Sequence, residues 1–86
     1  MWKVEFSEDS DNYLDRLDND ISERIENALK RLENNPIPSD SKFIERINGD
    51  KVFRYRIGKY RALYKIKENE RVVFIIKIDK RSKVYE

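Results

Sequence analysis

The chain has 86 residues, with 19 Lys and Arg against 17 Asp and Glu, and it contains neither Cys nor His. These absences exclude disulfides, thiolate metal sites and every mechanism that uses histidine as general acid or base. No apolar run approaches the roughly 20 residues that span a bilayer. We therefore expect one small domain over residues 1–86, located in the cytoplasm.

The N-terminal half predicts a strand followed by two helices. Residues 2–6 alternate between apolar and charged side chains, as a half-buried strand does. Ser7 precedes a run of acidic and polar residues and is typical of a helix N-cap. Apolar residues recur at helical spacing over 21–32, and that helix should end before Pro36. With a shorter helix after Ser7, the segment predicts an antiparallel helical hairpin.

The C-terminal half predicts a hairpin-rich sheet. Segment 43–47 is open to two interpretations, an edge strand or a loop. Gly58 favours a two-residue type II′ turn, because glycine suits its first central position, and residues 68–70 suggest a three-residue turn. Three strands are expected at about 51–57, 60–67 and 71–78. The result is an α+β fold of order β-α-α-β-β-β, a small antiparallel sheet with the helical hairpin packed on one face.

Alternation along these strands assigns each side chain to one face of the sheet. The face expected beneath the helices comprises Phe53, Tyr55, Ile57, Tyr60, Ala62, Tyr64, Ile66, Val72, Phe74, Ile76 and Ile78. The opposite face comprises Val52, Arg54, Arg56, Arg61, Leu63, Lys65, Lys67, Arg71, Val73, Ile75 and Lys77. This second set, rich in cations, is called the basic face below.

Charge is distributed unevenly along the chain. Residues 1–50 hold 7 Lys and Arg against 13 Asp and Glu (−6), whereas residues 51–86 hold 12 against 4 (+8). Such a division indicates a polyanionic partner. The two-residue turn would place Arg56 opposite Arg61, and a three-residue second turn would place Arg61 opposite Lys77.

Facing like charges destabilise a sheet by about 0.2–1 kcal/mol per pair. We therefore interpret the basic face as an anion site, and arginine there suits bidentate phosphate binding. The alternative is a solvated face whose lysines protect a sheet edge from aggregation.

The runs FRYRIGKYRALY (53–64) and DKRSKVY (79–85), with the strand and helical hairpin before them, resemble the RelE toxins of the RelE/ParE superfamily. The resemblance implies the toxin of a type II toxin–antitoxin pair, which cleaves mRNA in the ribosomal A site and inhibits translation. It implies no metal and no cofactor, and it implies mRNA, the ribosome and a cognate antitoxin as partners.

Matched by motif, the family's active positions fall on Arg54, Arg56, Arg61, Arg81 and Tyr85. We expect catalytic roles for Arg56, Arg61, Arg81 and Tyr85. We expect RNA binding by Arg54, Lys59, Lys77, Lys80 and Lys83.

One departure from the family concerns the general base. RelE members often carry lysine on the strand before the glycine turn, where this chain has Arg54 and Arg56. Arginine stays protonated and is a poor general base. Either Tyr85, among cations that favour the phenolate, takes the proton, or the ribosome orients the 2′-hydroxyl while the arginines stabilise phosphate charge. A ParE-like gyrase inhibitor without catalysis and a non-catalytic RNA-binding module are the competing functions.

Overall fold

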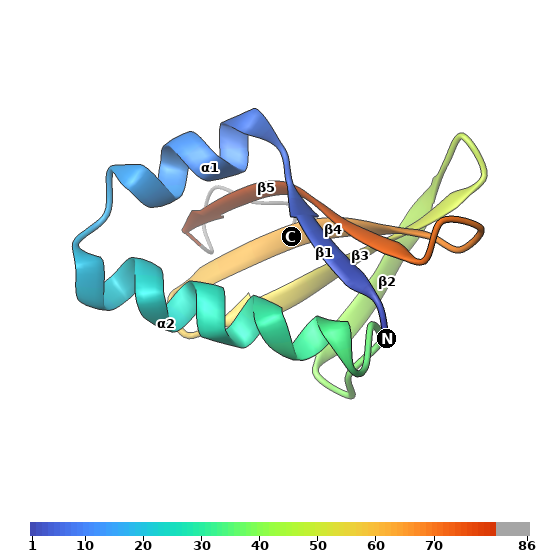
Figure 1. Cartoon of the computed structure of the whole chain (residues 1–86), viewed down its shortest axis with the longest axis horizontal. Helices are drawn as coiled ribbons and strands as arrows, with labels where there is room; N and C mark the ends of the chain where they lie inside the picture. The colour runs from blue at the N-terminus through green and yellow to red at the C-terminus, as the bar shows by residue number, and fades with distance from the viewer. Residues whose placement is uncertain (81–86) are drawn as a thin grey trace.

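A computed structural model describes residues 1–80 and shows two helices against one five-stranded sheet (Figure 1). The elements are β1 (Lys3–Phe6), α1 (Glu8–Asp15), α2 (Asn19–Lys30), the 3₁₀ turn η1 (Arg31–Glu33), β2 (Ser41–Ile47), β3 (Asp50–Ile57), β4 (Tyr60–Lys67) and β5 (Val72–Lys80). The strand order is β1-β5-β4-β3-β2, and only β1, which pairs with β5, is parallel to its neighbour. The expected α+β fold is confirmed, and segment 43–47 belongs to an edge strand.

Two serines fix the start of α1 and attach it to the sheet. Ser7 is the predicted N-cap, because its Oγ accepts a hydrogen bond from the Ser10 amide at 3.0 Å. The same Oγ donates to the carbonyl of Ile76 at 2.8 Å, and the buried Ser10 hydroxyl donates to that of Ile75 at 3.2 Å. α1 therefore lies along β5, and α2 runs back in the opposite direction across the same side of the sheet (Figure 1).

The core lies between the helices and the predicted face of β3 and β4. The buried cluster joins Leu14, Ile25, Ala28, Leu29 and Leu32 to Phe53, Tyr55, Ile57, Ala62, Tyr64, Ile66, Val73, Ile75 and Ile78. The predicted assignment of side chains to the two faces of the sheet is therefore confirmed for β3 and β4. Neither helix in residues 1–80 is both long and apolar enough to cross a membrane.

The faces expected for β5 were wrong over most of its length. Val73 and Ile75 lie in the core, whereas Phe74 lies on the basic face with the amines of Lys65 and Lys67 at 5.5 and 5.3 Å from its ring centre. The reason is the length of the β4–β5 turn. Because Lys67 pairs with Val72, the turn holds four residues instead of three and inverts the alternation.

A β-bulge then restores the predicted alternation near the end of β5. Tyr64 pairs with Ile75, but Leu63 pairs with Lys77, so Ile76 is the inserted residue. Ile78 consequently lies in the core as expected. The extra turn residue and the bulge each shift the register by one residue, so the partner of Arg61 changes from Lys77 to Asp79. Arg61 faces Asp79, and the expected pairing with Lys77 was wrong.

The β3–β4 hairpin formed as predicted. Ile57 pairs with Tyr60, leaving a two-residue loop at Gly58 and Lys59. Of these two residues only Gly58 has positive φ, at +57°, which is the pattern of a type II′ turn. The short loop fixes the register that places Arg56 opposite Arg61.

Candidate functional site

Two arginines of β3 lie in one hollow at the end of the sheet. Arg54 and Arg56 are two residues apart and so point to the same face. They line a hollow of about 470 Å³ together with Asp40, Lys42 and Gly58. Lys42 is the register partner of Arg54 on the neighbouring strand β2. Three cations and one carboxylate therefore surround a space that is open to solvent.

A row of charged residues crosses the sheet beside this hollow. Arg56 on β3 pairs with Arg61 on β4, as expected, and Arg61 pairs with Asp79 on β5. At the other end of the row, Asp40 directly precedes the Ser41–Tyr55 pair and lines the hollow together with Arg56. Arg56 is exposed, whereas Arg61 is only 4% exposed.

Carboxylates at both ends of the row change the expected balance of charge. Opposite charges on neighbouring strands offset the repulsion between Arg56 and Arg61. Repulsion between stacked cations is therefore not by itself a sign of an anion site. The composition of the hollow is the stronger indication, because it gathers Lys42, Arg54 and Arg56 around open space.

The remaining predicted residues lie elsewhere on the described surface or outside the described residues. Lys59 is exposed in the turn after Gly58. Lys77 and Lys80 are exposed on β5, opposite Leu63 and Tyr60, and neither is among the residues lining the hollow. Arg81, Lys83 and Tyr85 lie outside residues 1–80, which the structure describes.

Sequence reasoning missed Asp40 and Lys42. Both precede segment 43–47, for which an edge strand and a loop remain open in the sequence, so neither residue could be assigned to a position beside Arg54 and Arg56. The signal in the sequence is Asn48-Gly49, because an Asn-Gly pair between two apolar runs predicts a two-residue hairpin and so a strand beside β3. The register shift between Phe43 and Glu45 is also needed to place Lys42 opposite Arg54. The structure has that hairpin, with Ile47 paired to Asp50.

The loop that carries Asp40 is attached to the core by hydrogen bonds. The Tyr64 hydroxyl donates to the carbonyl of Pro36 at 2.7 Å. The amide and hydroxyl of Ser41 donate to the carbonyl of Pro38 at 3.0 and 2.7 Å. Burial raises the pKa of Tyr64 to about 12, because the phenolate is poorly solvated there. These contacts hold the backbone of the loop immediately before β2, where Asp40 lies.

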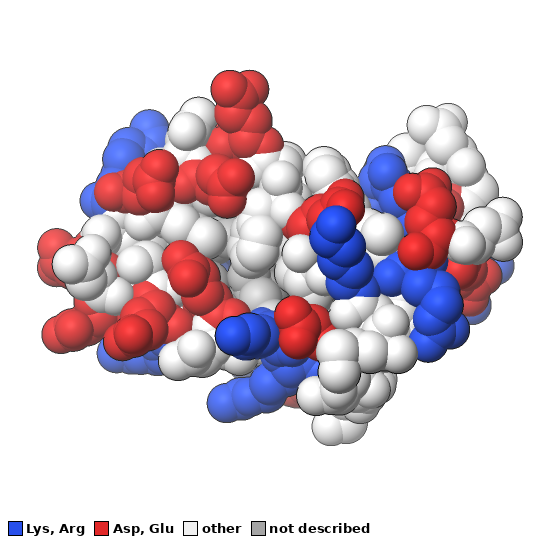
Figure 2. Space-filling model, in the orientation of Figure 1, with Lys and Arg blue, Asp and Glu red and all other residues white. Residues whose placement is uncertain are grey.

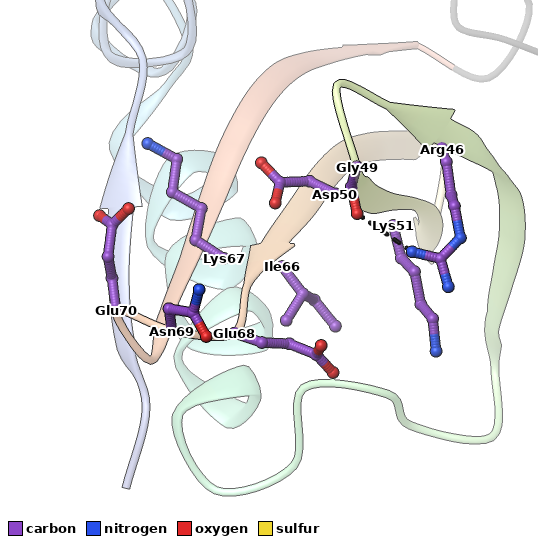
Figure 3. Close-up of a pocket in the computed structure, with 9 residues that line it drawn as sticks. All are labelled: Arg46, Gly49, Asp50, Lys51, Ile66, Lys67, Glu68, Asn69 and Glu70. Carbon is purple, nitrogen blue, oxygen red and sulfur yellow. Dashed lines mark hydrogen bonds between the residues drawn. The ribbon is translucent and has the colours of Figure 1, made fainter.

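A smaller hollow of about 180 Å³ lies at the other end of β3 (Figure 3). Its charges are mixed, because Arg46, Lys51 and Lys67 alternate with acidic residues, and Arg46 Nη1 donates to the carbonyl of Gly49 at 3.0 Å. The complete lining is Arg46, Gly49, Asp50, Lys51, Ile66, Lys67, Glu68, Asn69 and Glu70. Acidic side chains also gather over α1 and α2 (Figure 2). Neither region has the cationic excess of the hollow at Arg54 and Arg56.

The chain is similar in sequence to known toxins. Residues 1–85 match the family described as the ParE toxin of the type II toxin–antitoxin system parDE. The RelE1 protein of Methanocaldococcus jannaschii is 36% identical over 64 residues, which cover 73% of this chain and 71% of the relative.

Solved structures share the fold over nearly the whole chain. RelE in the RelE–RelB complex of Pyrococcus horikoshii OT3 has a TM-score of 0.84 at 23% identity, covering 96% of this chain and 98% of that one. The RelBE2 toxin–antitoxin complex of Mycobacterium tuberculosis gives 0.78 at 26% identity, covering 93% and 98%. The isolated RelE toxin of Escherichia coli gives 0.73 at 23% identity, covering 99% and 92%.

Proposed function

Because the chain belongs to the ParE toxin family of type II toxin–antitoxin systems and is a RelE-type member of the RelE/ParE superfamily, we propose that it is a ribosome-dependent endoribonuclease. It cleaves mRNA in the ribosomal A site without a metal ion and thereby inhibits translation in the cytoplasm. The observation that carries this proposal is the hollow lined by Lys42, Arg54 and Arg56. Such a site suits a phosphodiester, because guanidinium groups form paired hydrogen bonds to phosphate oxygens.

The arginines act on the charge that develops during cleavage. Attack of a 2′-oxygen on the adjacent phosphorus concentrates negative charge on the non-bridging oxygens. Arg54 and Arg56 reach these oxygens from β3, and Arg61 contributes from the next strand. Arg61 is only 4% exposed, and a charge with so little solvent around it interacts strongly with charge that develops nearby.

The other predicted cations extend the contact along the RNA. Lys59, Lys77 and Lys80 are exposed, and in this proposal they bind backbone phosphates beyond the hollow. Arg81 and Tyr85 keep the catalytic positions that the resemblance implies, with Tyr85 orienting the nucleotide, and Lys83 keeps its expected role in RNA binding. We also propose a cognate antitoxin as partner, since toxin–antitoxin complexes are among the structures that share this fold.

The test is cleavage of a defined mRNA during translation in vitro with the purified protein. We expect cuts at the A-site codon, and we expect Arg56→Ala to reduce the cleavage rate by about 10²–10³-fold, as for loss of one transition-state donor. Arg24→Ala is the matched control, because Arg24 is an exposed cation on α2. Intact message, or equal rates for the wild type and Arg56→Ala, would overturn the proposal.

The matched family favours one second candidate, a ParE-like inhibitor of DNA gyrase that binds without catalysis. A supercoiling assay with purified gyrase separates the two functions. Inhibition of supercoiling by a protein that leaves ribosome-bound mRNA intact would select the gyrase inhibitor.

A further inference from the structure

The hollow contains a proton acceptor that the family resemblance did not indicate. Of the described residues that line it, Asp40 is the one with a carboxylate, and the other charged groups are Lys42, Arg54 and Arg56. Arginine and protonated lysine cannot accept a proton. Cleavage by a 2′-hydroxyl requires the loss of its proton, so the hollow supplies both an anion site and a base.

The position of Asp40 is set by the fold. Asp40 directly precedes β2, whose first residue Ser41 pairs with Tyr55, and it lines the same hollow as Arg56. Hydrogen bonds from Tyr64 to the carbonyl of Pro36 and from Ser41 to the carbonyl of Pro38 hold the loop that carries it. Asp40 itself is exposed, so its carboxylate is accessible to a substrate in the hollow.

We propose that Asp40 is the general base for this cleavage, an inference that rests on the proposed endoribonuclease function. Asp40 takes the proton of the 2′-hydroxyl as the O–H bond breaks, and the 2′-oxygen forms a bond to phosphorus. The bond from phosphorus to the 5′-oxygen breaks, and water protonates the departing 5′-oxygen. The products are a 2′,3′-cyclic phosphate and a 5′-hydroxyl end.

The surrounding cations make a carboxylate compatible with an anionic substrate. Lys42, Arg54 and Arg56 outnumber Asp40 three to one within the hollow. The site therefore attracts phosphate and still contains one group, the Asp40 carboxylate, that can accept a proton. General-base catalysis contributes about 10²–10⁴-fold to a rate, and that range sets the expected effect of removing the carboxylate.

The experiment measures single-turnover cleavage on ribosomes carrying a defined A-site codon, together with the affinity of each protein variant for those ribosomes. Asp40→Asn should cleave about 10²–10⁴-fold more slowly than the wild type. Its affinity should remain within about three-fold, because the lost group acts in the chemical step. Asp40→Glu should retain more activity than Asp40→Asn, since it keeps a carboxylate.

Asp50→Asn is the matched control, because Asp50 lies at the opposite end of β3 and lines the other hollow. Tyr85→Phe tests the competing base and should slow cleavage less than Asp40→Asn does. If the wild type cleaves and Asp40→Asn cleaves equally fast, or if Tyr85→Phe alone abolishes cleavage, the role of Asp40 is overturned while the nuclease remains. A wild type that cuts no ribosome-bound mRNA overturns the proposed function and this inference together.

Discussion

Tyr64 connects the core of the sheet to the loop that carries Asp40. Its side chain is completely buried and stacks on Phe53 with ring centres 5.6 Å apart, while its hydroxyl donates to the carbonyl of Pro36. Burial raises its pKa from the ordinary 10.0 to about 12. Ionisation of this one side chain therefore opposes folding.

We expect stability to fall at alkaline pH because of Tyr64. The folded protein holds this proton more tightly than the unfolded chain, so the contribution is complete below pH 10 and is lost as pH rises towards 12. Between these pH values, this one group lowers the free energy of unfolding by about 1.4 kcal/mol per pH unit. At neutral pH, Tyr64→Phe should lower the free energy of unfolding by about 1 kcal/mol, because the hydrogen bond to Pro36 is lost. Between pH 10 and 12, the free energy of unfolding of this variant should fall less steeply than that of the wild type. Urea unfolding at several pH values measures both effects, and an unchanged alkaline slope would contradict the assignment to Tyr64.

At the scale of the elements, α1 depends on its N-cap and on its attachment to β5. Ser7 supplies both, through its bonds to the Ser10 amide and to the carbonyl of Ile76. Ser7→Ala should therefore lower the free energy of unfolding by about 1–2 kcal/mol. This is the upper part of the range for loss of an N-cap, because the bond to Ile76 is lost as well. Ser22→Ala is the control, because the Ser22 hydroxyl donates to the carbonyl of Asn19 within an exposed part of α2. Equal loss of stability in the two variants, measured by urea unfolding, would contradict this role for Ser7.

Elements specified by local chemistry were predictable from the sequence. The cap at Ser7 and the turn at Gly58 follow from adjacent residues, and the turn set the register of Arg56 and Arg61. The faces of β5 were not predictable in this way. A four-residue turn and a bulge at Ile76 depend on how β5 packs against both β4 and α1. Arg54 and Arg56 could be placed by alternation, but Asp40 and Lys42 required the pairing of β2 with β3.

At the scale of the whole molecule, the acidic helices and the basic sheet separate charge within one small domain. The separation predicts that ribosome binding weakens steeply with salt, because each phosphate contact releases counterions. Arg56→Ala should lower the slope of log affinity against log salt by about 1. Arg24→Ala on α2 should leave that slope unchanged. A salt titration of ribosome affinity measures both, and a slope that is the same for wild type and Arg56→Ala would exclude phosphate contact by Arg56.

The single inserted residue at Ile76 also affects how relatives of this protein should be compared. Suppose that one of two relatives has the inserted residue in β5 and the other lacks it. An alignment without a gap there then matches an inward-pointing residue of one protein to an outward-pointing residue of the other. Columns around Lys77 and Asp79 would then mix basic and acidic positions that are not equivalent in space. Superposition of backbones, with the gap placed at Ile76, is the sounder basis for deciding which toxins share a carboxylate beside Arg61.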